Sequence, residues 1–147
     1  MEKAKHSELP KFKYHPSPFS TGSLVDSEET CPCCGSARGY MYEGPIYCTA
    51  DVDRVCPWCV ADGTAAAKWN AEFTDGEFRD SHGDQVELPR EVYDEVFRRT
   101  LGIRGAMQPI SWWVHCGEPA EFVGIEDDRI RFRCRTCGKR RSYRDLD

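Results

Sequence analysis

Nine cysteines in 147 residues give this chain a thiol content well above that of an average intracellular protein. Four of them form two C-x-x-C pairs, and 21 residues separate one pair from the other. A C-x-x-C pair can form a tight turn that points both sulfurs at one ion, and four thiolates complete the tetrahedral shell of zinc. Gly35 directly follows the first pair and supplies the backbone freedom that such a turn requires. We therefore expect a closed structural zinc site with four ligands: Cys31, Cys34, Cys56 and Cys59.

Four further donors near the C-terminus form a second candidate site: His115, Cys116, Cys134 and Cys137. Residues 120–126 and 129–134 alternate polar and apolar side chains around an Asp-Asp turn, which predicts a β-hairpin. A hairpin that leads into a C-x-x-C turn is the plan of a zinc ribbon, but one cysteine of a full set is missing. His115 is the expected fourth ligand, although its position next to another ligand is geometrically awkward. Glu118 and Glu121 are weaker candidates for the fourth ligand. The sequence leaves it equally open whether this ribbon has lost its metal ion.

The remaining cysteines, Cys33 and Cys48, are expected to be small buried side chains, although Cys33 could replace a neighbouring ligand. The Cys56-Pro-Trp-Cys59 segment also permits a second interpretation, because a C-P-x-C dithiol at a helix start can exchange disulfides. The residues before Cys56 lack the βαβ pattern of a thioredoxin-type fold, so a redox role is the weaker hypothesis. The common motifs of hydrolases, metalloproteases and nucleotide-binding enzymes are absent, and we expect no enzymatic activity.

The elements that must position these residues fall into four stretches: an extended N-terminal arm (1–30), a four-cysteine zinc module with a helix (31–80), a helical connector (81–105) and a C-terminal ribbon-like hairpin (106–147). In the second stretch we expect a hairpin over residues 39–48 and a helix over residues 62–73, capped by Asp62. Another helix begins at Pro89, with an apolar face made by Val92, Tyr93, Val96 and Phe97. The predicted fold is a small α+β protein in which zinc-ribbon-like hairpins with Cys knuckles accompany one or two short helices.

Charge is distributed unevenly along the chain. It has 20 Lys and Arg against 25 Asp and Glu, but residues 129–144 hold eight basic residues and no acidic one. Four arginines share one face of the second strand of the C-terminal hairpin: Arg129, Arg131, Arg133 and Arg135. Such a row could bind the phosphates of a nucleic acid. The favoured alternative is pairing with acids of the neighbouring strand, Glu118, Glu121 and Glu126.

Five segments resemble the CbrC family of small, Cys-rich bacterial proteins: residues 9–18, 39–47, 56–66, 98–102 and 113–124. The resemblance extends over residues 9–147, and the CPWC-x-A-D-G block is its most specific part. It implies a bacterial, cytoplasmic protein with a role in toxin tolerance, and it assigns no catalytic residue. The CbrC pattern often has a further cysteine near position 120, where this chain has Ala120, so the resemblance does not complete the second site.

The longest apolar run is only a few residues, and the first ten residues lack the apolar segment of a signal peptide, so we expect a cytoplasmic protein without a membrane span. Two functions are compatible with one or two bound zinc ions. The first is a non-enzymatic, immunity-type protein that binds a protein partner such as a basic toxin, which its acidic net charge would attract. The second is a zinc-ribbon module, either nucleic-acid-binding or regulatory, that uses the arginine strand. No small-molecule substrate is evident.

Overall fold

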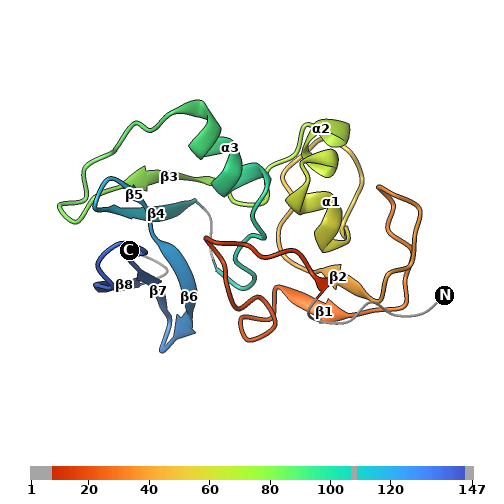
Figure 1. The fold of residues 1–147 in the computed structure, drawn as a ribbon, viewed down its shortest axis with the longest axis horizontal. Coiled ribbons are helices and arrows are strands. Elements are labelled where there is room, and N and C mark those ends of the chain that lie inside the picture. Colours follow the sequence, from red (N-terminus) through yellow and green to blue (C-terminus); the bar gives the residue numbers. More distant parts are fainter. Residues whose placement is uncertain (1–7, 107–108, 145–147) are drawn as a thin grey trace.

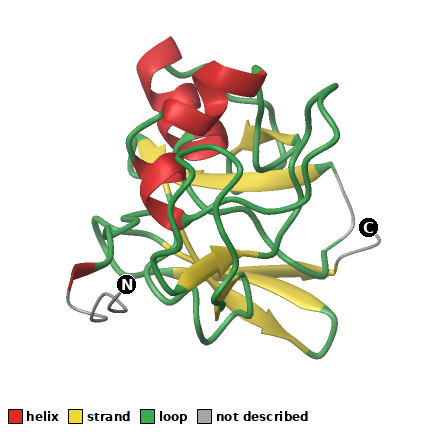
Figure 2. Cartoon of the chain, turned by 90° about the vertical axis from the view of Figure 1, so that its right-hand side faces the viewer, coloured by secondary structure: helices red, strands yellow, loops and turns green. Residues whose placement is uncertain are grey.

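The computed structural model describes residues 8–106 and 109–144. The elements in chain order are β1 (Leu24–Asp26), β2 (Tyr40–Tyr42), α1 (Pro57–Ala61), α2 (Thr64–Trp69), β3 (Gly76–Arg79), α3 (Arg90–Arg98), β4 (Ile110–His115), β5 (Glu118–Pro119), β6 (Glu121–Glu126), β7 (Arg129–Arg133) and β8 (Arg140–Arg144). Figure 1 shows β1, β2, α1 and α2 in one half of the molecule and β3 to β8 in the other, and Figure 2 shows the helices gathered on one side. The α+β class with hairpin sheets, short helices and Cys clusters is confirmed. Among the described residues, no helix has the length and apolar character needed to cross a membrane.

The first sheet joins the N-terminal arm to the Cys-rich stretch. Strands β1 and β2 pair antiparallel, with Leu24 opposite Tyr42. The hairpin expected over residues 39–48 is therefore wrong, because the partner of β2 comes from the arm and not from the residues that follow. On the other side, the amide of Tyr42 donates to the carbonyl of Val55 at 2.8 Å, so the backbone of β2 is bonded on both sides. All three residues of β2 are buried, which explains why a central position suits this short strand.

The helix expected over residues 62–73 is shorter in the structure. The N-cap of α2 is Gly63 and not Asp62, which ends α1 as its C-cap, so the expected capping is wrong. The carboxylate of Asp62 still accepts a hydrogen bond from the amide of Thr64 at 2.8 Å, across the turn between the two helices. The helix ends at Trp69, because Asn70 adopts a left-handed conformation with φ of 50°. Phe73 therefore lies beyond the helix, yet it is fully buried against Tyr42 in the core of the N-terminal half.

A parallel strand pair forms the second sheet. Strand β3 pairs with β4, and the crossover between them contains α3. Val96 and Phe97 of α3 are fully buried, and the ring of Phe97 packs edge-on against Trp112, so the expected apolar face of this helix is confirmed. This β3–β4 pairing was not expected, because a pairing between distant segments leaves no local signature in the sequence.

The third sheet contains the predicted C-terminal hairpin. Strands β6 and β7 pair antiparallel around Asp127 and Asp128, whose φ angles of 52° and 59° suit a tight two-residue turn. The alternation along β7 is as predicted, since Ile130 and Phe132 are buried while Arg129, Arg131 and Arg133 are more exposed. Strand β8 adds a third strand that the sequence analysis did not predict, because its basic residues mask the alternation.

Candidate metal centres

The first cluster contains the four cysteines predicted from the two C-x-x-C pairs. The sulfurs of Cys31, Cys34, Cys56 and Cys59 all lie within 4.8 Å of one another. The Sγ of Cys56 lies 3.8 Å from that of Cys34 and 3.6 Å from that of Cys59. Four sulfurs at about 2.3 Å from a tetrahedral zinc ion would be separated by about 3.8 Å. These four cysteines form no disulfide, so all four sulfurs are available to bind a metal ion.

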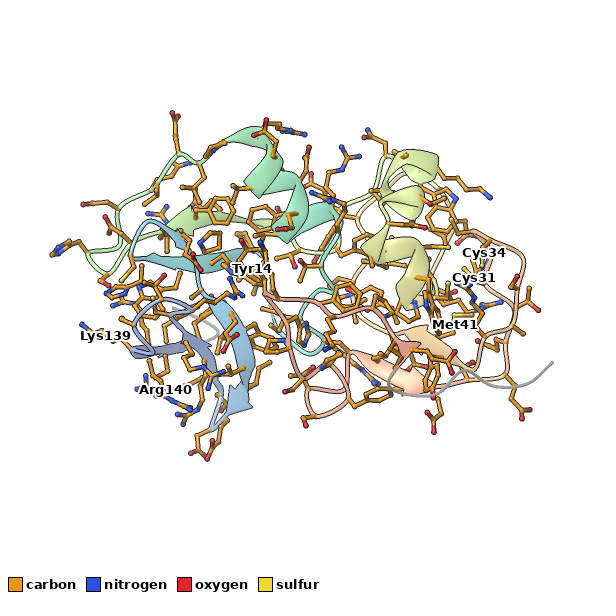
Figure 3. The ribbon with its side chains drawn as sticks, in the orientation of Figure 1. Tyr14, Cys31, Cys34, Met41, Lys139 and Arg140 are labelled. Atoms are coloured by element: carbon orange, nitrogen blue, oxygen red, sulfur yellow. The ribbon has the colours of Figure 1, made fainter. Side chains whose placement is uncertain are left out.

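The first pair of ligands is held by a tight turn. The amide of Gly35 donates to the carbonyl of Cys31 at 2.8 Å, and the amide of Cys31 donates to the carbonyl of Ser36 at 2.9 Å. Gly35 has a φ of 74°, which a residue with a side chain rarely adopts. This is the knuckle expected from the sequence, and Figure 3 shows the sulfurs of Cys31 and Cys34 close together beside α1.

The second pair is held differently, since it lies at the start of a helix and not in a second knuckle. Cys56 is the N-cap of α1, Pro57 is its first residue, and Cys59 follows one turn later. Proline favours this position because its fixed φ suits a helix start and its missing amide proton is not needed there. The bridge from Val55 to Tyr42 then holds Cys56 against the knuckle.

Hydrogen-bond donors and a positive charge surround the first knuckle. The Sγ of Cys31 accepts hydrogen bonds from the amides of Cys33 and Cys56, both at 3.3 Å. A hydrogen bond from the Cys56 thiol lowers the pKa of Cys31 below its usual value, and the same bond, together with burial, raises the pKa of Cys56. The ammonium of Lys68 donates to the carbonyls of Pro32 and Cys33 at 3.3 Å, which places a positive charge beside the first knuckle. Lys68 was not identified from the sequence, since it is 35 residues from Cys33 in the chain.

The second cluster consists of His115, Cys116, Cys134 and Cys137, whose ligand atoms also lie within 4.8 Å of one another. The Nδ1 of His115 is 3.4 Å from the Sγ of Cys116 and 3.4 Å from the Sγ of Cys137. A nitrogen at about 2.05 Å and a sulfur at about 2.3 Å from a tetrahedral zinc ion would be separated by about 3.6 Å. The nitrogen of His115 therefore lies where a fourth donor to one ion would lie.

The neighbouring donors His115 and Cys116 can face one ion because the backbone turns between them. His115 and Glu118 are paired across the β4–β5 hairpin, and Cys116 and Gly117 form its two-residue turn. Their φ angles are 54° and 78°, both in the left-handed region that a tight hairpin turn of this type requires. The two glutamates considered as alternative fourth ligands form ion pairs instead. Glu118 pairs with Arg135 at 3.3 Å, and Glu121 pairs with Arg133.

The last two ligands lie in a second knuckle that repeats the first. The amide of Gly138 donates to the carbonyl of Cys134 at 3.0 Å, and the amide of Cys134 donates to the carbonyl of Lys139 at 2.8 Å. These two bonds connect the same relative positions as those around Cys31, and Gly138 has a φ of 79°. Both C-x-x-C-G segments therefore adopt one backbone conformation, although they lie in separate halves of the chain.

The clusters differ in exposure. Cys31, Cys56 and Cys59 are buried in the N-terminal core, whereas Cys134 is the buried cysteine of the second cluster. The two remaining cysteines, Cys33 and Cys48, belong to neither group and are half-buried, which is more exposed than expected.

Arg129, Arg131 and Arg133 lie on β7, but Arg135 lies beyond the end of the strand, in the turn of the second knuckle, so the expected row of four on one strand is corrected. These arginines are partly neutralised by the predicted acids. Arg133 pairs with Glu121, Arg135 with Glu118 at 3.3 Å, and the Nε of Arg131 lies 3.5 Å from Glu126. Arg129 is exposed at the end of β7. The row is therefore in large part the outer, ion-paired face of the third sheet.

Comparison with known proteins identifies relatives of this chain. The model of an uncharacterised protein family, UPF0167, matches residues 9–130. The chain is 42% identical over 117 residues to UPF0167 proteins of Mycobacterium bovis and Mycobacterium tuberculosis, and 40% identical over 118 residues to one of Pseudomonas aeruginosa. Each alignment covers 79% of this chain, but the chain spans only 60% to 63% of the length of these relatives. No solved structure matches. The assignment to the CbrC family is corrected accordingly, because the family model and the relatives all carry the name UPF0167.

Proposed function

The chain belongs to the uncharacterised protein family UPF0167, and we propose that it is a non-enzymatic protein that binds two zinc ions, one in each cluster. The observation that carries this proposal is the convergence of four protein donors at both places. Thiolate and imidazole donors favour zinc over the hard ions magnesium and calcium. Four protein ligands complete the tetrahedral shell, so neither ion keeps an open position for a substrate.

The role proposed for the metal is to hold each half of the fold together. Cys31, Cys56 and Cys59 belong to the N-terminal hydrophobic core, and Cys134 belongs to the C-terminal one. Each ion would connect segments distant in sequence: the first knuckle with α1, and the β4–β5 turn with the second knuckle. Because such sites do not exist in the unfolded chain, the binding free energy of the metal contributes directly to folding.

A basic protein is the class of partner that we propose. Outside residues 129–144 the chain has 12 basic and 25 acidic residues, and such an excess attracts a positively charged surface. The expected role in toxin tolerance depended on the CbrC resemblance, so it loses its basis with that correction. The nucleic-acid alternative is weakened by the acids that pair with the arginine row. The redox alternative is weakened by the burial of Cys56, which has no exposed surface and lies among three other thiols.

Elemental analysis of the purified protein, combined with thiol titration under native conditions, tests this proposal. Two zinc ions per chain, with seven protected thiols and two reactive ones at Cys33 and Cys48, are the expected result. Protein without zinc, with Cys56 and Cys59 reacting rapidly, would overturn the structural role and favour disulfide exchange.

A further inference from the structure

A small hollow lies on the outer face of the third sheet, and none of the metal-ligand candidates lines it. It has a volume of about 100 Å³, and it is lined by Val123, Arg131, Phe132, Arg140, Arg141 and Ser142. No acidic residue is among them. Figure 3 shows Arg140 and Lys139 on the opposite side of the molecule from Cys31 and Cys34.

The strand register shows which of these side chains face the hollow. Arg131 is opposite Ser142, and Arg133 is opposite Arg140, so these residues share the outer face of the sheet. Phe132 is opposite Arg141, and the full burial of Phe132 places this pair on the inner face. Two guanidinium groups and one hydroxyl, from Arg131, Arg140 and Ser142, are therefore the polar groups available on the outer side.

An irregularity in β6 leaves this face open. The register between β6 and β7 shifts between Phe122 and Gly124, as in a β-bulge, and Val123 is the extra residue. Gly124 then lies opposite Arg131, and a Cβ built on it would meet nothing within 4 Å. The neighbour of Arg131 across the strands thus has no side chain to fill the hollow.

The guanidinium of Arg131 has an unused donor. Its Nε is buried and has no hydrogen-bond partner, because Glu126 at 3.5 Å does not meet hydrogen-bond geometry. The side chain as a whole is 38% exposed, so the terminal nitrogens of the guanidinium can donate to an anion in the hollow. Arg133, by contrast, is already bonded to Glu121.

We propose that this hollow binds a phosphate group through Arg131, Arg140 and Ser142. The space is sufficient for one tetrahedral oxyanion but too small for a nucleoside, so recognition is limited to the phosphate itself. Guanidinium forks suit phosphate oxygens geometrically, and the serine hydroxyl adds a neutral donor. This site is independent of the proposed zinc-binding function, since it contains no metal ligand.

Titration of the purified full chain with inorganic phosphate, followed by 31P NMR at constant ionic strength, tests the proposal. We expect saturable binding, and Arg131→Gln and Arg140→Gln should each weaken it roughly 10- to 100-fold, the loss of one charge-assisted contact. Arg129→Gln is the matched control, because Arg129 lies on the same strand and does not line the hollow. Circular dichroism and thermal unfolding confirm that each variant is folded.

Two results would overturn the proposal: equal binding by wild type and Arg131→Gln, or equal weakening by Arg129→Gln, which would indicate only a general charge effect. A short oligothymidylate in competition with phosphate identifies the source of the group. Competition indicates a phosphodiester, and phosphate binding that the oligonucleotide leaves unchanged indicates a small phosphorylated ligand; either result supports the site.

Discussion

The Nδ1 of His115 lies 3.4 Å from the Sγ of Cys137, a residue 22 positions further along the chain. The β4–β5 turn holds the histidine, and a separate knuckle holds the cysteine. The ring of His115 also packs against Trp113, with 4.8 Å between ring centroids, so its orientation is supported by the second core. This relationship completes a set of four donors that the cysteine spacing alone leaves incomplete.

Replacement of His115 should therefore affect one metal ion only. His115→Ala is expected to reduce the zinc content from two ions per chain to one, because three remaining thiolates leave the shell incomplete. Elemental analysis measures this, and His82→Ala is the control, since His82 is exposed and belongs to neither cluster. Retention of both ions in His115→Ala would show that another donor or water completes the second site.

Loss of a ligand in the first cluster should destabilise the N-terminal core. Cys56→Ser is expected to reduce the free energy of unfolding by about 4 kcal/mol, which is typical of the loss of a structural metal, and to lower Tm by roughly 8–16 °C. Cys48→Ser is the matched control, because Cys48 is half-buried and outside both clusters. Thermal unfolding with parallel zinc analysis checks this, and equal effects of the two substitutions would contradict it.

His15 should make the fold sensitive to mild acid. It is fully buried, its ring nitrogens contact the carbonyl of Leu101 at 2.9 Å and the hydroxyl of Thr21 at 2.7 Å, and burial lowers its pKa to about 4. Between pH 6.5 and pH 4 the unfolded chain binds a proton here that the folded chain does not, so stability falls as pH falls through this range.

Between pH 7 and pH 5 this effect amounts to about 2 kcal/mol. His15→Gln is expected to lose less stability than the wild type over the same interval by about that amount. Urea unfolding at both pH values measures the difference, and protonation of the zinc ligands affects both proteins alike. Parallel pH curves for the two proteins would exclude His15 as the cause.

The ion pair between Glu121 and Arg133 should contribute more than its neighbours on the same face. The side chain of Glu121 is 11% exposed, whereas that of Glu126 is 70% exposed. Glu121→Gln is expected to cost about 1–2 kcal/mol, and Glu126→Gln less than about 0.5 kcal/mol. Chemical denaturation compares the two variants, and a cost of Glu126→Gln equal to that of Glu121→Gln would contradict this ranking.

The sequence alone determined the features that depend on neighbouring residues. The spacing of Cys31 and Cys34 before Gly35 predicted a knuckle, because a C-x-x-C turn needs a residue that tolerates positive φ. The alternation along residues 129–133 predicted a strand with one buried face, and the Asp-Asp turn predicted the hairpin. The eight candidate metal ligands were all named from spacing and residue type, and the structure brings them together in two groups.

Only the tertiary structure decided which distant segments meet. The partner of β2 is β1 rather than residues 45–48, and β3 pairs in parallel with β4 across a long crossover that contains α3. Local sequence carries no record of such pairings, because they are chosen by the total apolar surface that the completed core buries. The same reason explains the hollow beside Arg131: a bulge in β6 and the unexpected strand β8 create it, and neither follows from the residues that line it.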